Sequence, residues 1–248
     1  RVRPARDETL LADWNGLAIA ALAQAGAAMD RADWVKAAIH AFDQVVKALG
    51  EGDRLYHSAN AGVRGAPAFA DDYAHMARAA LFLWEVTGEK RFLDAAKGWV
   101  TTLNDHFWNN EKGGYCTTAD DAQTLIVRAR VLYDQAVPSA NGIMTWVLTR
   151  LGQITGEGHY GQRARGQLEA FADEYGRAWA SCASYLNSLE TFVSGFQVVV
   201  MGPRSNPRTQ ELIKVVWGKV LPNRLLYVVD SGEALPTGHP AFGKGMIN

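Results

Sequence analysis

The stretch Asn15–Trp34, NGLAIAALAQAGAAMDRADW, decides the fold of this chain. It reads as an apolar helix, a short polar turn and a second helix that opens on an aromatic residue. Two later stretches repeat that order: Tyr73–Phe92, YAHMARAALFLWEVTGEKRF, and Asn141–Tyr160, NGIMTWVLTRLGQITGEGHY. The sequence therefore predicts a tandem array of helical hairpins, each of which buries one face against its neighbours.

Periodicity predicts the rest of the chain in less detail. In the first helix Leu11, Trp14, Ala18 and Leu22 fall on one stripe, which we expect to contact another helix. After a further helix at about 178–193, strand-like runs at 196–201 and 225–230 flank a helical pattern at 208–219. We predict residues 1–194 to be hairpins of a partial (α/α) toroid and 195–248 to be a small β-α-β appendage packed on it.

Two connections, residues 50–70 and 108–138, are much longer than usual helix–helix loops. Connections of this length usually carry function or small hairpins of their own. Within the second one, residues 115–118 and 125–132 suit a short β-hairpin.

Composition excludes several classes of function. The 248 residues are 48% hydrophobic, with 25 Lys and Arg against 26 Asp and Glu, so the chain is globular and nucleic acid is not an expected partner. No apolar run reaches eighteen residues, which argues against a membrane span. The two cysteines form no paired motif and favour reduced thiols in the cytoplasm. Neither a phosphate-binding glycine loop nor metal-ligand histidine spacing occurs, so we expect no cofactor and no metal.

Polar residues recur where the inner helices begin. Because those helices run parallel, their N-terminal ends converge at one side, where free N–H groups favour polar ligands. Candidate catalytic carboxylates are Asp7, Asp72 and Asp134. Candidate ligand-binding residues are Arg3, Trp14, Asn15, Tyr73, Ser139 and Asn141. Carboxylates beside aromatic rings are typical of sugar sites, in which two acids flank the reacting bond.

A simpler interpretation stays open for each of these residues. Asp71, Asp72, Ser139 and Asn141 lie where helix N-caps are needed, and aromatic residues at helical spacing usually belong to the core. Glu190 is either a buried acid or, as we favour, a solvated position. His75 is the one histidine placed to act as a base, although we favour a surface or packing role for it.

Three ordered motifs carry a resemblance to a known family. They are RVRPARD (1–7) leading into DWNGL (13–17), DDYA (71–74) and DQAVPSAN (134–141). The chain resembles thioredoxin-domain-containing proteins of the YyaL and spermatogenesis-associated type. This resemblance implies an N-terminal thioredoxin-like domain followed by a six-hairpin (α/α) toroid similar to those of N-acylglucosamine 2-epimerases and glycosidases. The present chain would be the C-terminal part of that toroid. A glutamate that the family usually has is replaced by Val137.

Three hypotheses follow for function. The first is a carbohydrate-active or carbohydrate-binding cleft with a sugar or small polar ligand, working by glycoside hydrolase-like or epimerase-like acid–base chemistry if it is an enzyme. The second is a non-catalytic module that binds client proteins for the thioredoxin-like domain. The third is proton transfer of the epimerase type, which needs two facing bases on inner helices.

Overall fold

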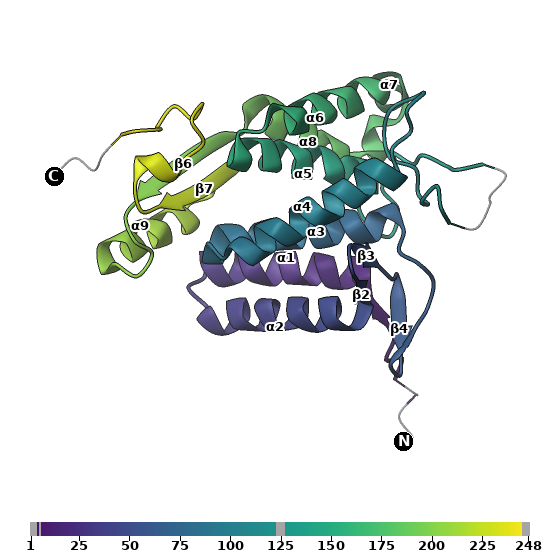
Figure 1. Ribbon diagram of the computed structural model, residues 1–248, viewed down its shortest axis with the longest axis horizontal. Helices are drawn as coiled ribbons and strands as arrows, with labels where there is room; N and C mark the ends of the chain where they lie inside the picture. Colours follow the sequence, from purple (N-terminus) through teal and green to yellow (C-terminus); the bar gives the residue numbers. More distant parts are fainter. Residues whose placement is uncertain (1–3, 5, 123–126, 245–248) are drawn as a thin grey trace.

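The computed structural model describes residues 4, 6–122 and 127–244, and the three predicted hairpins are present. They are α1 (Ala12–Ala28) with α2 (Ala32–Leu49), α3 (Ala70–Thr87) with α4 (Lys90–His106), and α5 (Ala140–Thr155) with α6 (Gly158–Ala170). Next come α7 (Ala172–Ala178), a 3-10 turn (Trp179–Ser181) and α8 (Ala183–Ser194), so the helix predicted at about 178–193 begins later than expected. Figure 1 shows the hairpins stacked side by side.

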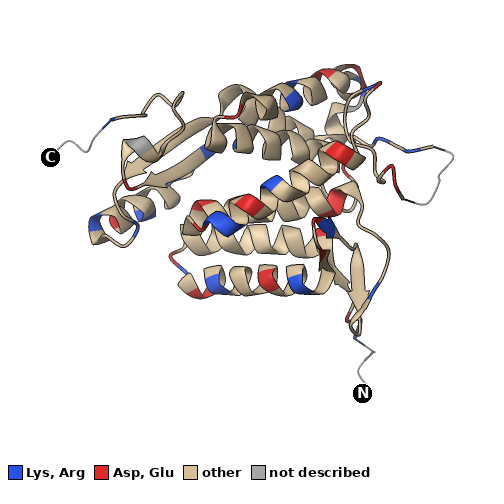
Figure 2. Ribbon diagram, in the orientation of Figure 1, with Lys and Arg blue, Asp and Glu red and all other residues tan. Residues whose placement is uncertain are grey.

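Packing divides the helices into an inner and an outer row. The inner helices α1, α3, α5 and α8 contact one another in that order, whereas α2, α4 and α6 each pack on their own hairpin partner. The inner helix α3 buries residues on nearly all sides, and the outer helix α2 buries only Ala38, Phe42, Val45 and Leu49. Acidic and basic residues accordingly alternate along α2 and α4 (Figure 2). The inner helices are therefore largely shielded from solvent, whereas each outer helix keeps one face exposed.

Glycine ends two of the inner helices. Gly88 after α3 and Gly156 after α5 adopt left-handed backbone conformations, with φ of 77° and 72°, and the amide of each bonds to a carbonyl four residues earlier. A glycine pays no steric cost in this conformation, which makes it the usual residue just past a helix end. The turns that the sequence predicted are therefore confirmed.

The face that α1 buries differs from the predicted one. Its buried residues include Gly16, Ile19 and Ala23, while Trp14 is 58% exposed, so the expected contact stripe through Trp14 and Ala18 is wrong. The reason is close helix packing: a Cβ added at Gly16 would lie 2.8 Å from the backbone carbonyl carbon of His75 on α3. Gly16 and the buried alanines of α1 permit this close approach.

Small strands occupy the first long connection. Strands β1 (Leu10–Leu11), β4 (Ser58–Asn60) and β5 (Val63–Arg64) form an antiparallel sheet, and β2 (Gly50–Glu51) pairs with β3 (Arg54–Leu55). The second connection differs from its prediction. Its described residues form no β-hairpin; Tyr115 instead bridges Trp108, and the amide of Thr117 donates to Ala129 O. Residues 123–126 of the expected hairpin lie outside the described part of the chain.

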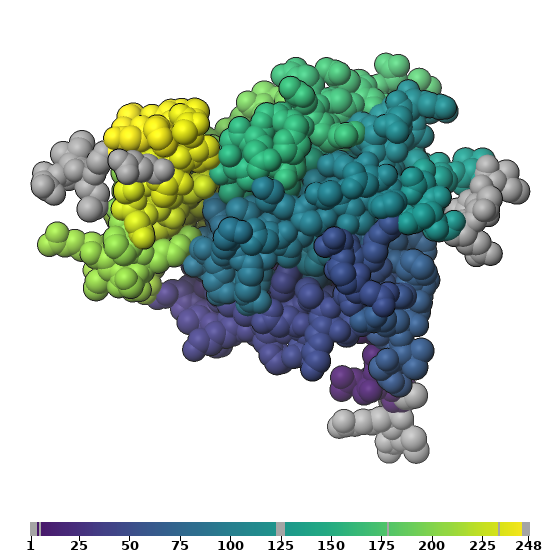
Figure 3. Space-filling view, viewed as in Figure 1, coloured from purple at the N-terminus to yellow at the C-terminus, as the bar shows by residue number. Residues whose placement is uncertain are grey.

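The β-α-β unit is present as predicted. Strand β6 (Phe196–Met201) runs parallel to β7 (Arg224–Val229) in a register that pairs Phe196 with Arg224, and α9 (Pro207–Trp217) connects them. Asn206 caps α9 and Pro207 follows at its first position, a favourable start for a helix. A short 3-10 turn, Gly232–Ala234, follows the second strand. Figure 3 shows the C-terminal segment gathered at one end of the molecule.

No helix in the described ranges is both long and apolar enough to cross a membrane.

Candidate functional site

The N-terminal ends of the inner helices lie together, as the sequence predicts, and two neighbouring aspartates of α3 connect them. Asp72 Oδ1 accepts a hydrogen bond of 3.1 Å from the amide of Asp13 on α1. Asp71 Oδ1 accepts one of 2.7 Å from the amide of Ala140, the first residue of α5. These amides have no partner within their own helices, so each carboxylate satisfies the end of a neighbouring helix. We call this junction the mouth.

Asp72 is the fully buried centre of the mouth. Its Oδ2 accepts from the amide of Phe69 at 2.8 Å, and His57 Nδ1 lies 3.0 Å from both of its oxygens. The hydrogen bond to Asp72 is the main cause that raises the pKa of His57. The pKa of Asp13 is raised as well, by burial first and by Asp72 second. The oxygens of Asp72 thus already face N–H donors from three directions.

This cluster also has the composition of a metal site. Asp13, His57 and Asp72 each offer a ligand atom, and these atoms lie within 4.8 Å of one another. The three residues are far apart in the sequence, since His57 precedes Asp72 by 15 residues and Asp13 precedes it by 59. They come together only in the folded chain. Sequence spacing gave no signal for this group.

Asp71 has the electrostatic character of a proton donor. Burial, with smaller contributions from Asp72 and Asp13, raises its pKa to about 6, although the bond from Ala140 works in the opposite direction. Among the described residues no hydrogen bond reaches its Oδ2. A carboxyl group with a pKa near neutrality is partly protonated at physiological pH and can exchange a proton with a ligand.

Asp134 and Ser139 connect the starts of α5 and α8. Asp134 Oδ1 accepts from the amide of Ser139 at 2.9 Å and from the hydroxyl of Ser184, and its Oδ2 accepts from the amide of Ser184 at 2.8 Å. The hydroxyl of Ser139 accepts from the amide of Gly142 and caps α5. The cap interpretation of Ser139 therefore agrees with its contacts, and Asp134 adds the fourth inner helix to the mouth.

Asn141 and Tyr73 are buried and bonded to the backbone. Asn141 Oδ1 accepts from the amide of Tyr115, and its Nδ2 donates to the carbonyls of Tyr115 and Val131. The hydroxyl of Tyr73 accepts from the amide of Leu55 at 3.0 Å. Both side chains hold the long connections against the inner helices.

The remaining predicted residues lie farther out. The side-chain amide of Asn15 donates from Nδ2 to Leu11 O, on the residue just before α1. Trp14 is exposed beside the mouth. Asp7 is exposed, and hydrogen bonds from Thr9 lower its pKa. Arg3 lies outside the described residues.

His75 is held in its neutral form. Its Nε2 lies 3.0 Å from Pro138 O, so this nitrogen donates, and burial lowers its pKa to about 4. Its buried Nδ1 has no hydrogen-bond partner among the described residues.

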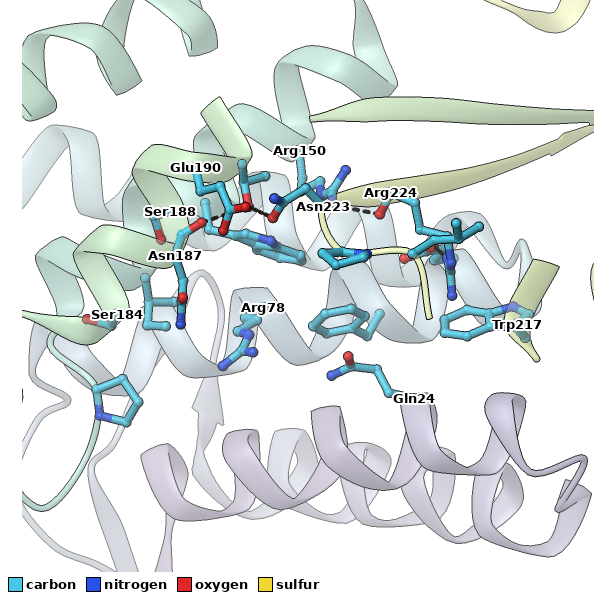
Figure 4. A pocket seen from close by; sticks show the side chains of 18 residues that line it. Gln24, Arg78, Arg150, Ser184, Asn187, Ser188, Glu190, Trp217, Asn223 and Arg224 are labelled. Carbon is cyan, nitrogen blue, oxygen red and sulfur yellow. Dashed lines mark hydrogen bonds and ion pairs between the residues drawn. The ribbon is translucent and has the colours of Figure 1, made fainter. Parts of the chain in front are cut away.

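A cavity of about 410 Å³ opens beside the inner helices, beyond the mouth (Figure 4). The rings of Phe82 and Trp146 stack in its wall with centroids 4.9 Å apart. Trp146 is only partly buried, so its indole is available to a ligand. The polar lining residues are Gln24, Arg78, Glu85, Arg150, Ser184, Asn187, Ser188, Glu190, Thr191, Asn223 and Arg224. The size and mixed lining suit a small polar ligand that has an apolar face.

One ion pair closes the far end of the cavity. Glu85 Oε1 lies 2.5 Å from Arg224 Nη1 and accepts from the amide of Leu226 at 2.9 Å. This pair joins α3 to β7 and is almost completely buried. Arg150 extends the network through a bond from Nη2 to Arg224 O. The cavity is therefore walled by both the helices and the β-α-β unit.

Sequence reasoning missed Arg78, Glu85, Trp146 and Arg150, although a signal was present. Asp71, Arg78 and Glu85 are seven residues apart along α3 and share one face, and Arg150 lies four residues after Trp146 on α5. Charged residues inside apolar inner helices could have identified the cavity wall. Glu190 lines the cavity but is exposed, which agrees with the solvated position we favoured.

Comparison with known proteins gives both sequence relatives and structural neighbours, while no family model matches the chain. The chain is 29% identical over 246 residues to spermatogenesis-associated protein 20 from Homo sapiens, which covers 93% of this chain and 31% of that protein. It is 28% identical over 242 residues to the protein of the same name from Mus musculus, with coverages of 90% and 30%. The chain thus spans about a third of the length of these curated relatives.

Solved structures establish the fold class. A GH76 alpha-mannanase from Bacteroides thetaiotaomicron matches with a TM-score of 0.63 and 14% identity, over 88% of this chain and 58% of that one. Cellobiose 2-epimerase from Bacillus thermoamylovorans matches with a TM-score of 0.60 and 12% identity, over 85% and 60%. The chain therefore has the helical-hairpin (α/α) toroid fold of these proteins, as the sequence predicted.

Proposed function

We propose that this chain forms one wall of a carbohydrate-binding cleft, with the cavity beside Trp146 as a sugar subsite. The observation that carries this proposal is the partly exposed indole of Trp146, backed by Phe82 and surrounded by amide, hydroxyl and guanidinium groups. An aromatic face packs against the apolar face of a sugar ring, and the polar groups bond to its hydroxyls.

The structural neighbours support this choice of ligand. They include a mannanase, two cellobiose 2-epimerases and a D-mannose isomerase. A Salegentibacter alpha-1,6-mannanase was solved with alpha-1,6-mannotriose as an inactive variant in which two consecutive aspartates are replaced by asparagine. The present chain also has two consecutive aspartates, Asp71 and Asp72, at the start of an inner helix.

In this proposal the carboxylates have different tasks. Asp71, with its pKa near 6 and one unbonded oxygen among the described residues, is the proton donor or acceptor. Asp72 and Asp134 hold the mouth together through bonds to helix ends. Trp14 lies beside the mouth, whereas Asp7 and Asn15 lie farther out. Asp71 lies about 10 Å along α3 from Arg78 in the cavity wall, at about 1.5 Å per residue.

Calorimetric titration with mannose, cellobiose and alpha-1,6-mannobiose tests the binding proposal. We expect at least one of these sugars to bind at millimolar or lower concentration and to lose its hydrolysis or epimerisation, if it is turned over, in Asp71→Asn. Absence of binding by every sugar, with an unchanged circular dichroism spectrum, would refute the cleft.

We also propose the organisation of the longer protein. Residues 1–194 form the toroid part and 195–248 the appendage, and a thioredoxin-like domain precedes them in a cytoplasmic protein. The threefold greater length of the relatives supports this proposal, because it leaves room for a further domain. If the cleft instead binds client proteins for that domain, clients trapped on its cysteines will be lost in Trp146→Ala, and sugars will not compete with them.

A further inference from the structure

Arg78 presents a guanidinium group to the cavity without a carboxylate to neutralise it. Its carbon Cζ lies 5.6 Å from the ring centroid of Phe82 and 5.8 Å from that of Trp146. No hydrogen bond or ion pair joins it to any other described residue, and Figure 4 draws none. Burial is the sole cause that lowers its pKa, so no nearby acid offsets the loss of hydration.

Arg150 adds a second cationic group that lacks a carboxylate bond. It is only 3% exposed, its Cζ lies 5.4 Å from the Trp146 centroid, and it lines the same cavity. Two of its nitrogens donate to Gln153 and to Arg224 O, while its buried Nε has no partner in the described part of the chain. Two arginines thus flank one indole.

No acid of the cavity forms an ion pair with Arg78 or Arg150 among the described residues. Glu85 is bonded to Arg224 and to the amide of Leu226, and its charge offsets only part of the effect of burial on the pKa of Arg150 and none of that on Arg78. Glu190 is exposed, and no ion pair connects it to Arg78. Burial of a guanidinium group without a counter-charge is costly, so this arrangement is favourable when an anion is bound.

We propose that the cavity selects a sugar that carries an anionic substituent, with the anion on Arg78 and the sugar ring against Trp146. This inference rests on the proposed function and narrows it to a substrate class. The shared chemistry is a planar or tetrahedral oxyanion, which guanidinium groups bind through paired N–H donors. Its two sources are a uronic acid carboxylate and a sugar phosphate.

Calorimetric titration of the intact protein with glucose, glucuronate, glucose 6-phosphate and inorganic phosphate distinguishes these cases. We expect glucuronate or glucose 6-phosphate, whichever anion fits, to bind at least about ten-fold more tightly than glucose. The preference is expected to weaken in high salt. Equal affinity for glucose and both anionic sugars would overturn the inference and leave the sugar cleft intact. Binding of phosphate but of no sugar would overturn the proposed function as well.

Substitution of Arg78 tests its assignment. Arg78→Met keeps the aliphatic stem over Phe82 and should abolish the preference for the anionic sugar, measured as the ratio of its affinity to that of glucose. Arg78→Lys keeps the charge and should retain part of the preference, which separates charge loss from misfolding. The control is Arg163→Met, because Arg163 on the outer helix α6 also lies over an indole, that of Trp108 at 4.1 Å. A preference that survives in Arg78→Met would refute the assignment.

Discussion

The indole ring of Trp146 on α5 stacks on the phenyl ring of Phe82 on α3, with centroids 4.9 Å apart and planes inclined by 30°. This contact joins two inner helices of different hairpins at the wall of the cavity. The same residues therefore contribute to packing between hairpins and to the lining of the cavity. Binding and stability must be measured separately in any test of this site.

Close packing of α1 against α3 predicts opposite effects for two glycine substitutions. Gly16→Ala places a Cβ 2.8 Å from the backbone of His75, which cannot move aside without separating the helices, so the free energy of unfolding should fall by about 1–3 kcal/mol. The matched control is Gly161→Ala on α6, where nothing lies within 4 Å and the better helix former should stabilise by about 0.5–1 kcal/mol. Urea denaturation measures both. Equal effects would contradict the packing described here.

The central position of Asp72 predicts a large loss of stability. Asp72→Ala removes the acceptor for Asp13, Phe69 and His57 and should lower the free energy of unfolding by roughly 2–4 kcal/mol. In Asp72→Asn the pKa of His57 should fall, because its raised value depends mainly on this partner. Proton NMR titration of the imidazole measures that pKa. An unchanged His57 pKa in the variant would show that the pair does not form.

The raised pKa of His57 predicts how the stability of the protein changes with pH. Because its pKa is higher in the folded state than the ordinary 6.5, its contribution to stability is complete below about pH 6.5 and is lost as the pH rises through the folded pKa. Thermal melting between pH 6 and pH 9 should therefore show a decrease in the wild type that is smaller in His57→Gln.

The raised pKa of Asp71 predicts a second change in stability, at lower pH. Its folded pKa of about 6 exceeds the ordinary 3.8, so the stability it contributes is present below about pH 4 and is lost as the pH rises through 6. Asp71→Asn keeps an acceptor oxygen for the amide of Ala140 and removes the titration. Between pH 4 and pH 7 the wild type should lose roughly 2–3 kcal/mol relative to this variant. Parallel stability curves for the two proteins would show that Asp71 has an ordinary pKa.

The ion pair between Glu85 and Arg224 predicts that α3 and the β-α-β unit depend on each other. Glu85→Ala leaves Arg224 buried without a counter-charge and should cost roughly 3–5 kcal/mol. The control is Asp94→Ala, which breaks the exposed pair with Lys90 and should cost less than about 1 kcal/mol. Chemical denaturation followed by circular dichroism compares them. Similar small costs would mean that the Glu85 pair does not hold the two parts together.

The hairpins were predictable from the sequence because their signals are local. Periodicity specifies the helices, and the glycines at 88 and 156 specify the ends of α3 and α5. The buried face of α1 could not be predicted in the same way, because alanines occur on several sides of this helix. The close approach of Gly16 to the backbone of His75 identifies the face that packs against α3. The cluster of His57 with Asp72 was missed because it depends on the long connection folding back. Ser139 was predictable as a cap, whereas Asp71 capping a different helix was not.

The residues of the cavity wall could be predicted from the sequence only in part. Periodicity separates buried from exposed faces, but a residue such as Arg78 that faces a cavity belongs to neither class. A charge within an apolar helix was the available signal. It indicates a buried partner or a ligand without stating which one.

Sugar affinity in Trp146→Ala, measured by calorimetry beside Trp34→Ala, tests the central claim most directly. Trp34 on the outer helix α2 also has an arginine over its ring, Arg31 at 4.5 Å, and so controls for the loss of an indole elsewhere. We predict that the sugar bound by the wild type binds at least about ten-fold more weakly to Trp146→Ala and unchanged to Trp34→Ala. Equal affinity in the two folded variants would contradict a sugar subsite at Trp146.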